Sequence, residues 1–333
     1  MIHMNNRTLS FDLMRVVAIF AIVLLHFTPD TNYPALNFIL HISTRWAVPF
    51  FFALSGYFYA VIYFEKNESY THLIAKQIHK IFLYAILGTL LTNASPIVNA
   101  HDKNPVIAIG TFIKQTYYTL MNFEIGSGVL WFLQALLLAY IILYCYLDFF
   151  GPRFLSIVTI LLLIISGLGQ NHDAYAPFLP FKFPTATRNA LYMGFPYLSL
   201  GFLTYRIKAN IKPHVLAATV LASFMLMLIE PITLYTYGMI TINSDAYFFT
   251  PIFVSSLIMM LRSIHITHTF DGRSISTMVF LVYILHTIVG RLVLQGRPND
   301  SLVYPFVIFT ISFALSFICV QTWKFLRTHY NNA

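Results

Sequence analysis

Charged residues are scarce in this chain of 333 residues, since Asp, Glu, Lys and Arg make up only 10% of it. Soluble domains carry about 25% charged residues. A soluble chain of this length needs a charged exterior in contact with water. Hydrophobic residues make up 58%, and the mean hydropathy is +0.71. The missing charge therefore indicates that lipid covers most of the surface and that the protein is integral to a membrane.

Cysteine is nearly absent, and several catalytic motifs are missing altogether. Cys145 and Cys319 lie in apolar runs without metal-ligand spacing, so we expect small core residues rather than a disulfide. His265 and His268 form a pair with no third ligand nearby, so no metal site is expected. There is no Walker loop, dinucleotide-binding glycine pattern or nucleophile elbow. Any chemistry must therefore come from polar groups within the membrane.

A helix that crosses the hydrocarbon needs about 20 mostly apolar residues. Segment 105–121 is mixed and is expected to lie along the interface, and 28–45 and 100–127 are the best candidates for a large extracytoplasmic loop. No soluble domain fits between the spans, so we expect an all-α polytopic protein with one membrane domain over 1–333 and no appended soluble domain. About ten stretches qualify as spans: 11–28, 46–64, 80–99, 128–149, 154–169, 189–206, 214–235, 246–263, 275–295 and 302–324.

The distribution of Lys and Arg predicts the orientation. The first helix is expected to stay uncleaved, because Asp12 and Arg15 interrupt its apolar run and no small-x-small site follows His26. With a cytoplasmic N-terminus, twelve of the 20 Lys and Arg lie inside, six lie outside, and Arg15 and Arg291 lie within spans. This positive-inside bias predicts that both termini are cytoplasmic. It also explains the net charge of +8 without nucleic acid, which is not expected as a partner.

The first span holds three ionisable groups: Asp12, Arg15 and His26. Ionisable groups within a span are costly and mark functional sites. Arg15 and His26 are eleven residues apart, so they share a helix face about 16 Å apart along the axis. Asp12 lies one turn before Arg15 and is placed to pair with it. Taken singly, Arg15 could snorkel to the interface and His26 could be a hydrogen-bonded core residue, but the pair in register favours function.

The ninth span contains a second polar group in Tyr283-Ile-Leu-His286. Tyr283 and His286 are three residues apart and share a helix face. Both core hydrogen bonding and a functional role fit this pair.

Five motifs occur in order along the chain: Arg15-x10-His26, Arg45-Trp-Ala-Val-Pro-Phe-Phe-Phe-Ala-Leu-Ser55-Gly-Tyr57, Leu130-Trp131-Phe-Leu, Gly194-Phe-Pro-Tyr-Leu-Ser-Leu-Gly201 and Tyr283-Ile-Leu-His286. This ordered set is far more specific than the Arg-x10-His spacing alone. It resembles the acyltransferase-3 family of bacterial integral membrane acyltransferases. The resemblance covers nearly the whole chain and is closest to the surface-polysaccharide or O-antigen O-acetylase type.

The resemblance implies a bacterial inner-membrane enzyme that moves an acetyl group from acetyl-CoA, a substrate rather than a tightly bound cofactor, to a hydroxyl of a cell-surface glycan or lipid-linked saccharide. It implies a catalytic group of His26, Asp12 and Arg15, with His26 as general base. Arg15, Lys76 and Lys80 are expected to bind the phosphates of the donor. The acceptor or pocket residues implied are Arg45, Ser55, Tyr57, Trp131, Tyr283 and His286.

Two departures from the family pattern qualify these roles. Lys76-Gln-Ile-His79-Lys80 stands where many members have an arginine cluster, and Val129 stands where many have His. Three other functions compete with acyl transfer: a transporter or flippase of lipid-linked glycan or acyl donor, a glycan polymerase, and a membrane anchor. A polymerase is expected to carry a large extracytoplasmic loop, and an anchor does not explain an Arg and a His in register within a span.

Overall fold

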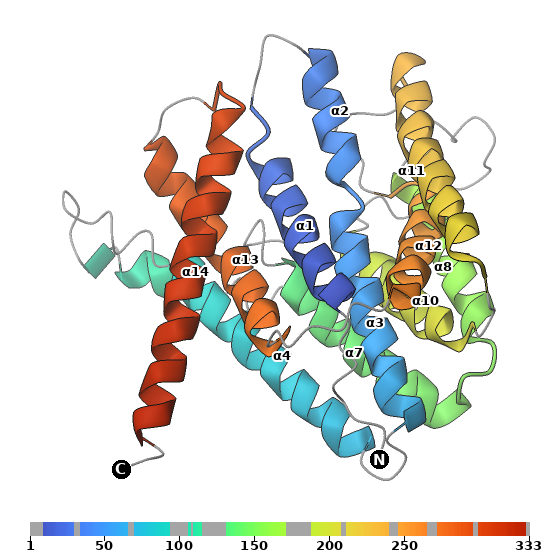
Figure 1. The fold of residues 1–333 in the computed structure, drawn as a ribbon, viewed down its shortest axis with the longest axis horizontal. Coiled ribbons are helices and arrows are strands. Elements are labelled where there is room, and N and C mark those ends of the chain that lie inside the picture. The colour runs from blue at the N-terminus through green and yellow to red at the C-terminus, as the bar shows by residue number, and fades with distance from the viewer. Residues whose placement is uncertain are drawn as a thin grey trace. The chain divides into compact units, whose positions relative to one another are not determined.

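A computed structural model of the chain describes residues 9–29, 34–65, 70–93, 106–107, 109–114, 131–170, 188–207, 211–239, 246–264, 272–295 and 299–330. Throughout these residues every regular element is a helix (Figure 1). Helices are expected in a bilayer because it offers no water to backbone N–H and C=O groups, which a helix satisfies within itself. The prediction of an all-α polytopic membrane protein is confirmed.

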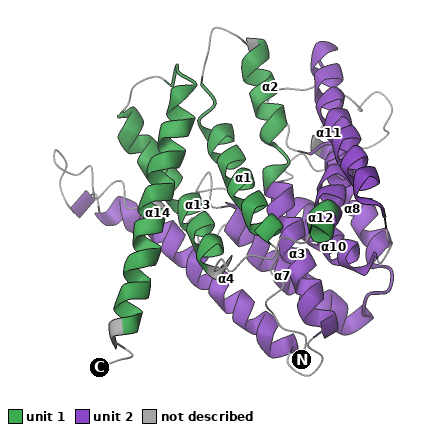
Figure 2. Ribbon diagram, in the orientation of Figure 1, with its two compact units in different colours: residues 1–47, 260–333 green, residues 48–259 purple. Residues whose placement is uncertain are grey.

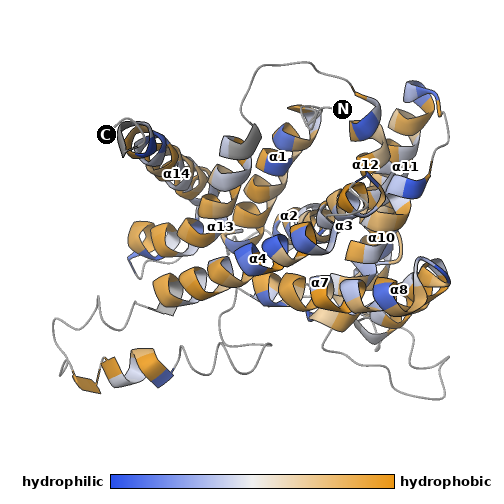
Figure 3. Cartoon of the chain, turned by 90° about the horizontal axis from the view of Figure 1, so that it is seen from below, coloured by the Kyte–Doolittle hydropathy of each residue, from blue (hydrophilic) through white to orange (hydrophobic). Residues whose placement is uncertain are grey.

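Seven of the described helices are long and apolar enough to cross a membrane, and apolar residues dominate their surfaces (Figure 3). Two shorter apolar helices, Leu155–Gly169 and Thr250–Ser263, correspond to the predicted fifth and eighth spans. The predicted sixth span, 189–206, contains a short π-helix followed by an α-helix. The seven long stretches are Leu9–His26, Ala35–Glu65, Tyr70–Leu91, Trp131–Phe150, Pro213–Thr236, Ser274–Leu294 and Val303–Thr328.

Two boundaries differ from the sequence-based expectation. Helix α4 (Tyr70–Asn93) begins ten residues before the predicted span at 80–99, so Lys76 and Lys80 lie within it. Helix α2 (Pro34–Thr44) forms inside segment 28–45, which was expected to be a loop. Its 11 residues are too few to cross a bilayer, which needs about 20. Of segment 105–121, only 106–107 and 109–114 are described, so its interfacial location stays a prediction.

The described helices group into two compact units, residues 1–47 with 260–333, and residues 48–259 (Figure 2). The single membrane domain over 1–333 stays a prediction. In the first unit, α1 contacts α2, α13 and α14, and α13 packs along α14. The ring of Phe20 on α1 lies 5.2 and 5.1 Å from the rings of Phe306 and Phe309 on α14. This unit comprises α1 (Leu9–His26), α2, α13 (Gly272–Leu294) and α14 (Val303–Tyr330).

In the second unit, α10 packs against α7 and α8, and α4 packs against α7. Helices α3 and α10 cross so closely that a Cβ added at Gly56 would overlap the carbonyl oxygen of Leu198, and one at Gly201 would overlap that of Ala53. Only glycine permits this approach from both sides. The unit holds nearly all of α3 (Ala47–Glu65), α4, α7 (Trp131–Phe150), α8 (Leu155–Gln170), η3 (Ala190–Gly194), α10 (Phe195–Arg206), α11 (Pro213–Thr236) and most of α12 (Thr250–Ser263).

The carboxylate of Glu230 joins two helices of the second unit. It lies on α11 and accepts hydrogen bonds from the backbone N–H groups of Phe248 and Phe249, at 2.9 and 3.1 Å. These residues precede α12, whose first N–H groups have no partner within the helix. A negative charge at this end is also favourable to the helix dipole. Glu230 therefore stabilises the start of α12.

The expected core position of both cysteines is wrong. Cys145 on α7 and Cys319 on α14 have exposed side chains. The outer face of a membrane helix contacts lipid tails and is as apolar as its inner face. Hydropathy therefore does not tell which face a small apolar residue occupies.

Candidate active site

Helices α1 and α13 run parallel and in register, and they join the polar groups that the sequence singles out. Near one end, Arg15 donates to the hydroxyl of Ser276 at 3.3 Å. Near the other, the ring centroids of His26 and His286 lie 5.6 Å apart. The eleven-residue spacing on α1 thus matches a ten-residue spacing on α13. The helix face that carries Arg15 and His26 therefore faces α13. Ionisable groups within a membrane span are expected to face protein rather than lipid.

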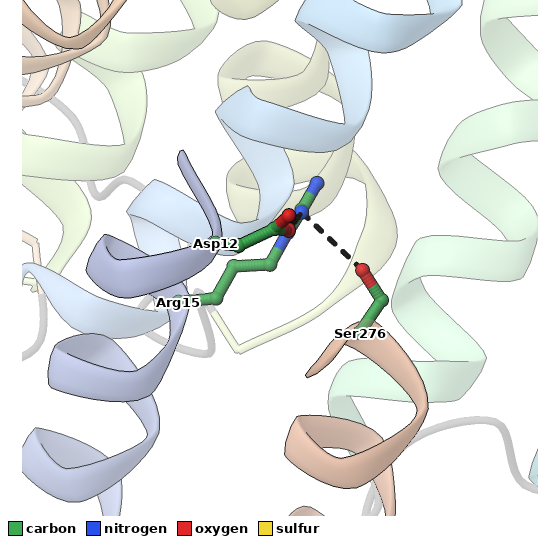
Figure 4. A network of polar contacts seen from close by, with 3 residues as sticks. All are labelled: Asp12, Arg15 and Ser276. Carbon is green, nitrogen blue, oxygen red and sulfur yellow. Dashed lines mark hydrogen bonds and ion pairs between the residues drawn. The ribbon is translucent and has the colours of Figure 1, made fainter. Parts of the chain in front are cut away.

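Asp12 and Arg15 form the ion pair that their spacing predicts (Figure 4). Asp12 is 2% and Arg15 8% exposed, so Arg15 does not snorkel to an interface. Ser276 on α13 provides a further acceptor for the same guanidinium nitrogen. Since a buried charge is tolerated only when it is paired and hydrogen-bonded, Asp12 and Ser276 explain how Arg15 is accommodated.

His26 and His286 have opposite exposure, although their rings are neighbours. His26 is the last residue of α1 and has an exposed side chain. His286 is fully buried, and its Nδ1 lies 3.0 Å from the backbone carbonyl oxygen of Val282. A carbonyl only accepts, so Nδ1 carries the proton and Nε2 of the neutral ring carries the lone pair. Among the described residues, Nε2 of His286 has no hydrogen-bond partner.

The chain just after His26 is held in place from α13 and from the segment before α14. The side-chain amide of Asn299 donates to the carbonyl oxygens of Phe27 and Thr28, at 3.0 and 3.1 Å. The ring of Phe27 lies edge-on to His286 at 6.3 Å, and it fills the space where a Cβ at Gly290 would stand. These contacts hold the end of α1, and therefore His26, beside His286.

Two further residues that were predicted to line the acceptor pocket belong to the first unit. Tyr283 is buried, with its ring 6.0 Å from that of His286, as their shared helix face predicts. Arg45 is buried in the turn that follows α2.

The remaining residues that were predicted to line the acceptor pocket lie in the second unit. Ser55 is half-buried and its hydroxyl donates to Phe51 of its own helix at 2.8 Å, so that donor is used locally. Tyr57 is buried against the ring of Tyr205. Trp131 begins α7, 6.2 Å from the ring of Phe52.

The two lysines predicted to bind the donor are on one exposed stretch of α4. Lys76 and Lys80 are both exposed and lie four residues apart, which places them on the same helix face. The ammonium of Lys80 stands 5.4 Å from the ring centroid of Tyr84, a cation–π distance. Both charges are therefore accessible to an anionic ligand.

Sequence analysis missed three residues that shape the histidine pair, Phe27, Gly290 and Asn299, and also Ser276, which accepts a hydrogen bond from Arg15. Their roles depend on partners far away in the chain, so a single sequence gave no local signal for Ser276 or Asn299. Gly290 did carry a local signal. A glycine in the middle of a helix is destabilising, so its presence suggests that a neighbouring side chain needs the space. His265, His268 and Val129 lie outside the described residues.

Comparison with known proteins adds the following. The profile of the acyltransferase 3 family, described as "Acyltransferase domain", matches residues 8–321. An amino-acid racemase of Enterococcus faecalis is 25% identical over 305 residues, which cover 86% of this chain and 41% of that protein. Since more than half of that protein lies outside the match, its racemase activity is not assigned to this chain. No solved structure matches the chain.

Proposed function

The chain belongs to the acyltransferase-3 family, and we propose that it moves an acetyl group from acetyl-CoA to a hydroxyl of a cell-surface glycan or lipid-linked saccharide. The family match implies a transferase, and the long apolar helices make it a multi-pass membrane protein. The donor, the acceptor and the residues below are parts of the proposal.

One observation carries this proposal: the imidazole of His26 is exposed at the end of a membrane helix whose same face holds a buried Arg15. A hydroxyl is a weak nucleophile and needs a base that is neutral near pH 7, for which histidine is the natural side chain. An exposed imidazole can be reached by a substrate. A His26 that served only to fill the core would be buried instead.

The proposed reaction balances without an outside reagent. The neutral ring of His26 takes the proton of the acceptor hydroxyl while the oxygen attacks the thioester carbonyl. The tetrahedral intermediate collapses, the carbon–sulfur bond breaks, and the CoA thiolate leaves. His26 then returns its proton to the thiolate, so that the products are an O-acetyl ester and free CoA.

The phosphates of acetyl-CoA require cations, and three are proposed. Lys76 and Lys80 offer exposed ammonium groups on α4. Arg15 is the third cation, and its guanidinium carries five N–H groups. The distance from Arg15 to His26, about 16 Å along the helix, is about the reach of an extended pantetheine arm. This supports phosphate binding near Arg15 and thioester binding near His26.

The proposed location is the bacterial inner membrane, with both termini on the cytoplasmic side. The excess of Lys and Arg in the loops on that side supports this orientation. The parallel course of α1 and α13 is consistent with both termini on one side, because the first and ninth of the ten predicted spans should cross in the same direction.

The test is base-labile acetate on the surface polysaccharide of cells that express wild type, His26→Ala or His214→Ala. His214 is exposed at the start of α11 and serves as the matched histidine control. We expect ester with wild type and with His214→Ala, and none with His26→Ala at equal membrane abundance. Full acetylation by His26→Ala would contradict the role of base. No ester from wild type, with acetyl-CoA unconsumed, would favour a transporter or flippase.

A further inference from the structure

The buried imidazole of His286 has one nitrogen whose purpose the fold does not explain. Its Nδ1–H is satisfied by the carbonyl oxygen of Val282 at 3.0 Å. Its Nε2 lone pair is buried, and no described residue donates to it. A buried acceptor without a partner is unfavourable, and native proteins rarely keep one without a role.

The arrangement excludes two simple roles for His286. With Nδ1–H already donated, the neutral ring has no N–H left to stabilise an oxyanion. With a fully buried side chain, His286 is closed to an acceptor hydroxyl from outside. A neighbouring side chain is therefore the natural partner for Nε2.

His26 is the neighbour with a suitable donor. Among the described residues, the rings of His26, Tyr283 and Phe27 lie 5.6, 6.0 and 6.3 Å from that of His286. A hydrogen bond of about 3 Å between two imidazole nitrogens places the ring centroids roughly 5 to 5.5 Å apart. The observed 5.6 Å, with an interplanar angle of 31°, is close to that geometry and too long for face-to-face stacking. The χ2 torsion of histidine is soft and His26 is exposed, so its ring can turn a nitrogen toward Nε2 of His286.

We propose that His286 is the positioning residue for the base: its Nε2 accepts a hydrogen bond from a ring N–H of His26. This inference rests on the proposed function. The bond fixes the tautomer of His26, so that its other nitrogen presents the lone pair to the acceptor hydroxyl. When that nitrogen takes the hydroxyl proton, the imidazolium keeps its N–H···Nε2 bond to His286 and is stabilised by it. His286 remains neutral and never exchanges its own proton.

The experiment measures transfer of radiolabelled acetate from acetyl-CoA to base-labile ester in membrane vesicles that contain the surface polysaccharide and the full chain. His286→Leu keeps the volume and removes the acceptor, whereas His286→Gln places an amide oxygen near the position of Nε2. Thr287→Val is the matched control, because Thr287 is the next residue of α13 and its hydroxyl is bonded within its own helix, to Ile284. Membrane abundance and thermal unfolding are followed for every variant.

We expect His286→Leu to lower kcat by roughly 10- to 100-fold, with KM for acetyl-CoA, membrane abundance and Tm unchanged. His286→Gln should recover most of the activity, and Thr287→Val should behave as wild type.

The inference alone is overturned if wild type forms the ester and His286→Leu turns over equally well. It is also overturned if both His286 variants lose abundance together, which indicates a structural role, or if His286→Leu raises only the KM for acceptor, which indicates substrate binding. If wild type forms no ester, the proposed function fails first and this inference falls with it.

Discussion

The side chain of Asn299 donates to the backbone carbonyl oxygen of Phe27, 272 residues earlier in the chain, at 3.0 Å. A second hydrogen bond reaches Thr28 at 3.1 Å. One amide thus satisfies two carbonyls at the end of α1, where a helix leaves its last carbonyls without partners. His26 is the residue immediately before this anchored pair, so the position of the proposed base depends on a residue that lies just before α14.

Replacing Asn299 with Ala removes this anchor. We expect a loss of about 1–3 kcal/mol in the free energy of unfolding, because two partly buried hydrogen bonds disappear, and a several-fold lower kcat because the end of α1 is released. Thermal unfolding in detergent and the vesicle assay measure these effects. Asp300→Ala, at the exposed next residue, is the control. Equal Tm and kcat for Asn299→Ala and wild type would contradict the anchor.

The ion pair of Asp12 and Arg15 predicts that the effects of two substitutions on stability are not additive. Arg15→Met leaves the Asp12 carboxylate buried without its cation, which costs about 3–5 kcal/mol. Asp12→Leu combined with Arg15→Met removes both charges, so this double variant should be more abundant in the membrane and unfold at a higher temperature than Arg15→Met. Both variants should bind acetyl-CoA poorly. A double variant that is less stable than the single one would show that the pair is needed for folding beyond charge compensation.

The crossing of α3 and α10 predicts which glycines tolerate a methyl group. Gly56→Ala and Gly201→Ala each drive a Cβ into a backbone carbonyl that no side-chain movement can relieve. We expect each to destabilise the protein by about 3 kcal/mol, the upper range for overpacking, and to reduce its membrane abundance. Gly110→Ala is the control, since a Cβ there meets nothing within 4 Å. Wild-type Tm for Gly56→Ala would rule out the close crossing.

Gly290 offers a compensation test of the site. A Cβ at this position overlaps the ring of Phe27, and a ring can move where a backbone cannot. Gly290→Ala should therefore lower kcat more than stability, because it displaces the ring that packs against His286. Shortening the obstructing side chain in the double variant Gly290→Ala with Phe27→Leu should recover part of the activity. If the double variant is no better than Gly290→Ala, the contact does not position the site.

Exposed lysines on α4 predict a salt-dependent donor affinity. Lys76→Gln with Lys80→Gln should raise the KM for acetyl-CoA several-fold at low ionic strength and leave kcat near wild type, since charge attraction to phosphates acts mainly on binding. The difference should shrink at 1 M salt, where the Debye length falls to about 3 Å. Lys324→Gln, at an exposed lysine of α14, is the control. A KM that is independent of salt would assign the phosphates to other cations.

Local periodicity accounts for the predictions that the structure confirms. Helix geometry alone places Asp12 beside Arg15 and places Tyr283 beside His286, because partners three residues apart meet whatever the rest of the fold does. Hydropathy alone identifies the long apolar helices. By contrast, α2 escaped detection, because 11 residues are too short for the span criterion.

Predictions that depended on which way a helix faces were less secure. Cys145 and Cys319 were expected inside and are exposed, because the lipid side and the protein side of a membrane helix are both apolar. The sequence does not distinguish an inward from an outward position, since each depends on neighbours from other helices.

By itself, the sequence determined that this protein is a helical membrane protein of the acyltransferase-3 family and that one face of its first helix carries Asp12, Arg15 and His26. These properties follow from composition, from the 3.6-residue repeat and from motif order, which are all encoded locally. Only the tertiary structure decided that α13 covers that face in parallel register, that Ser276 meets Arg15, and that a buried His286 faces an exposed His26. Such pairings join residues about 260 positions apart, and they are set by the packing of whole helices rather than by the conformation of any one of them.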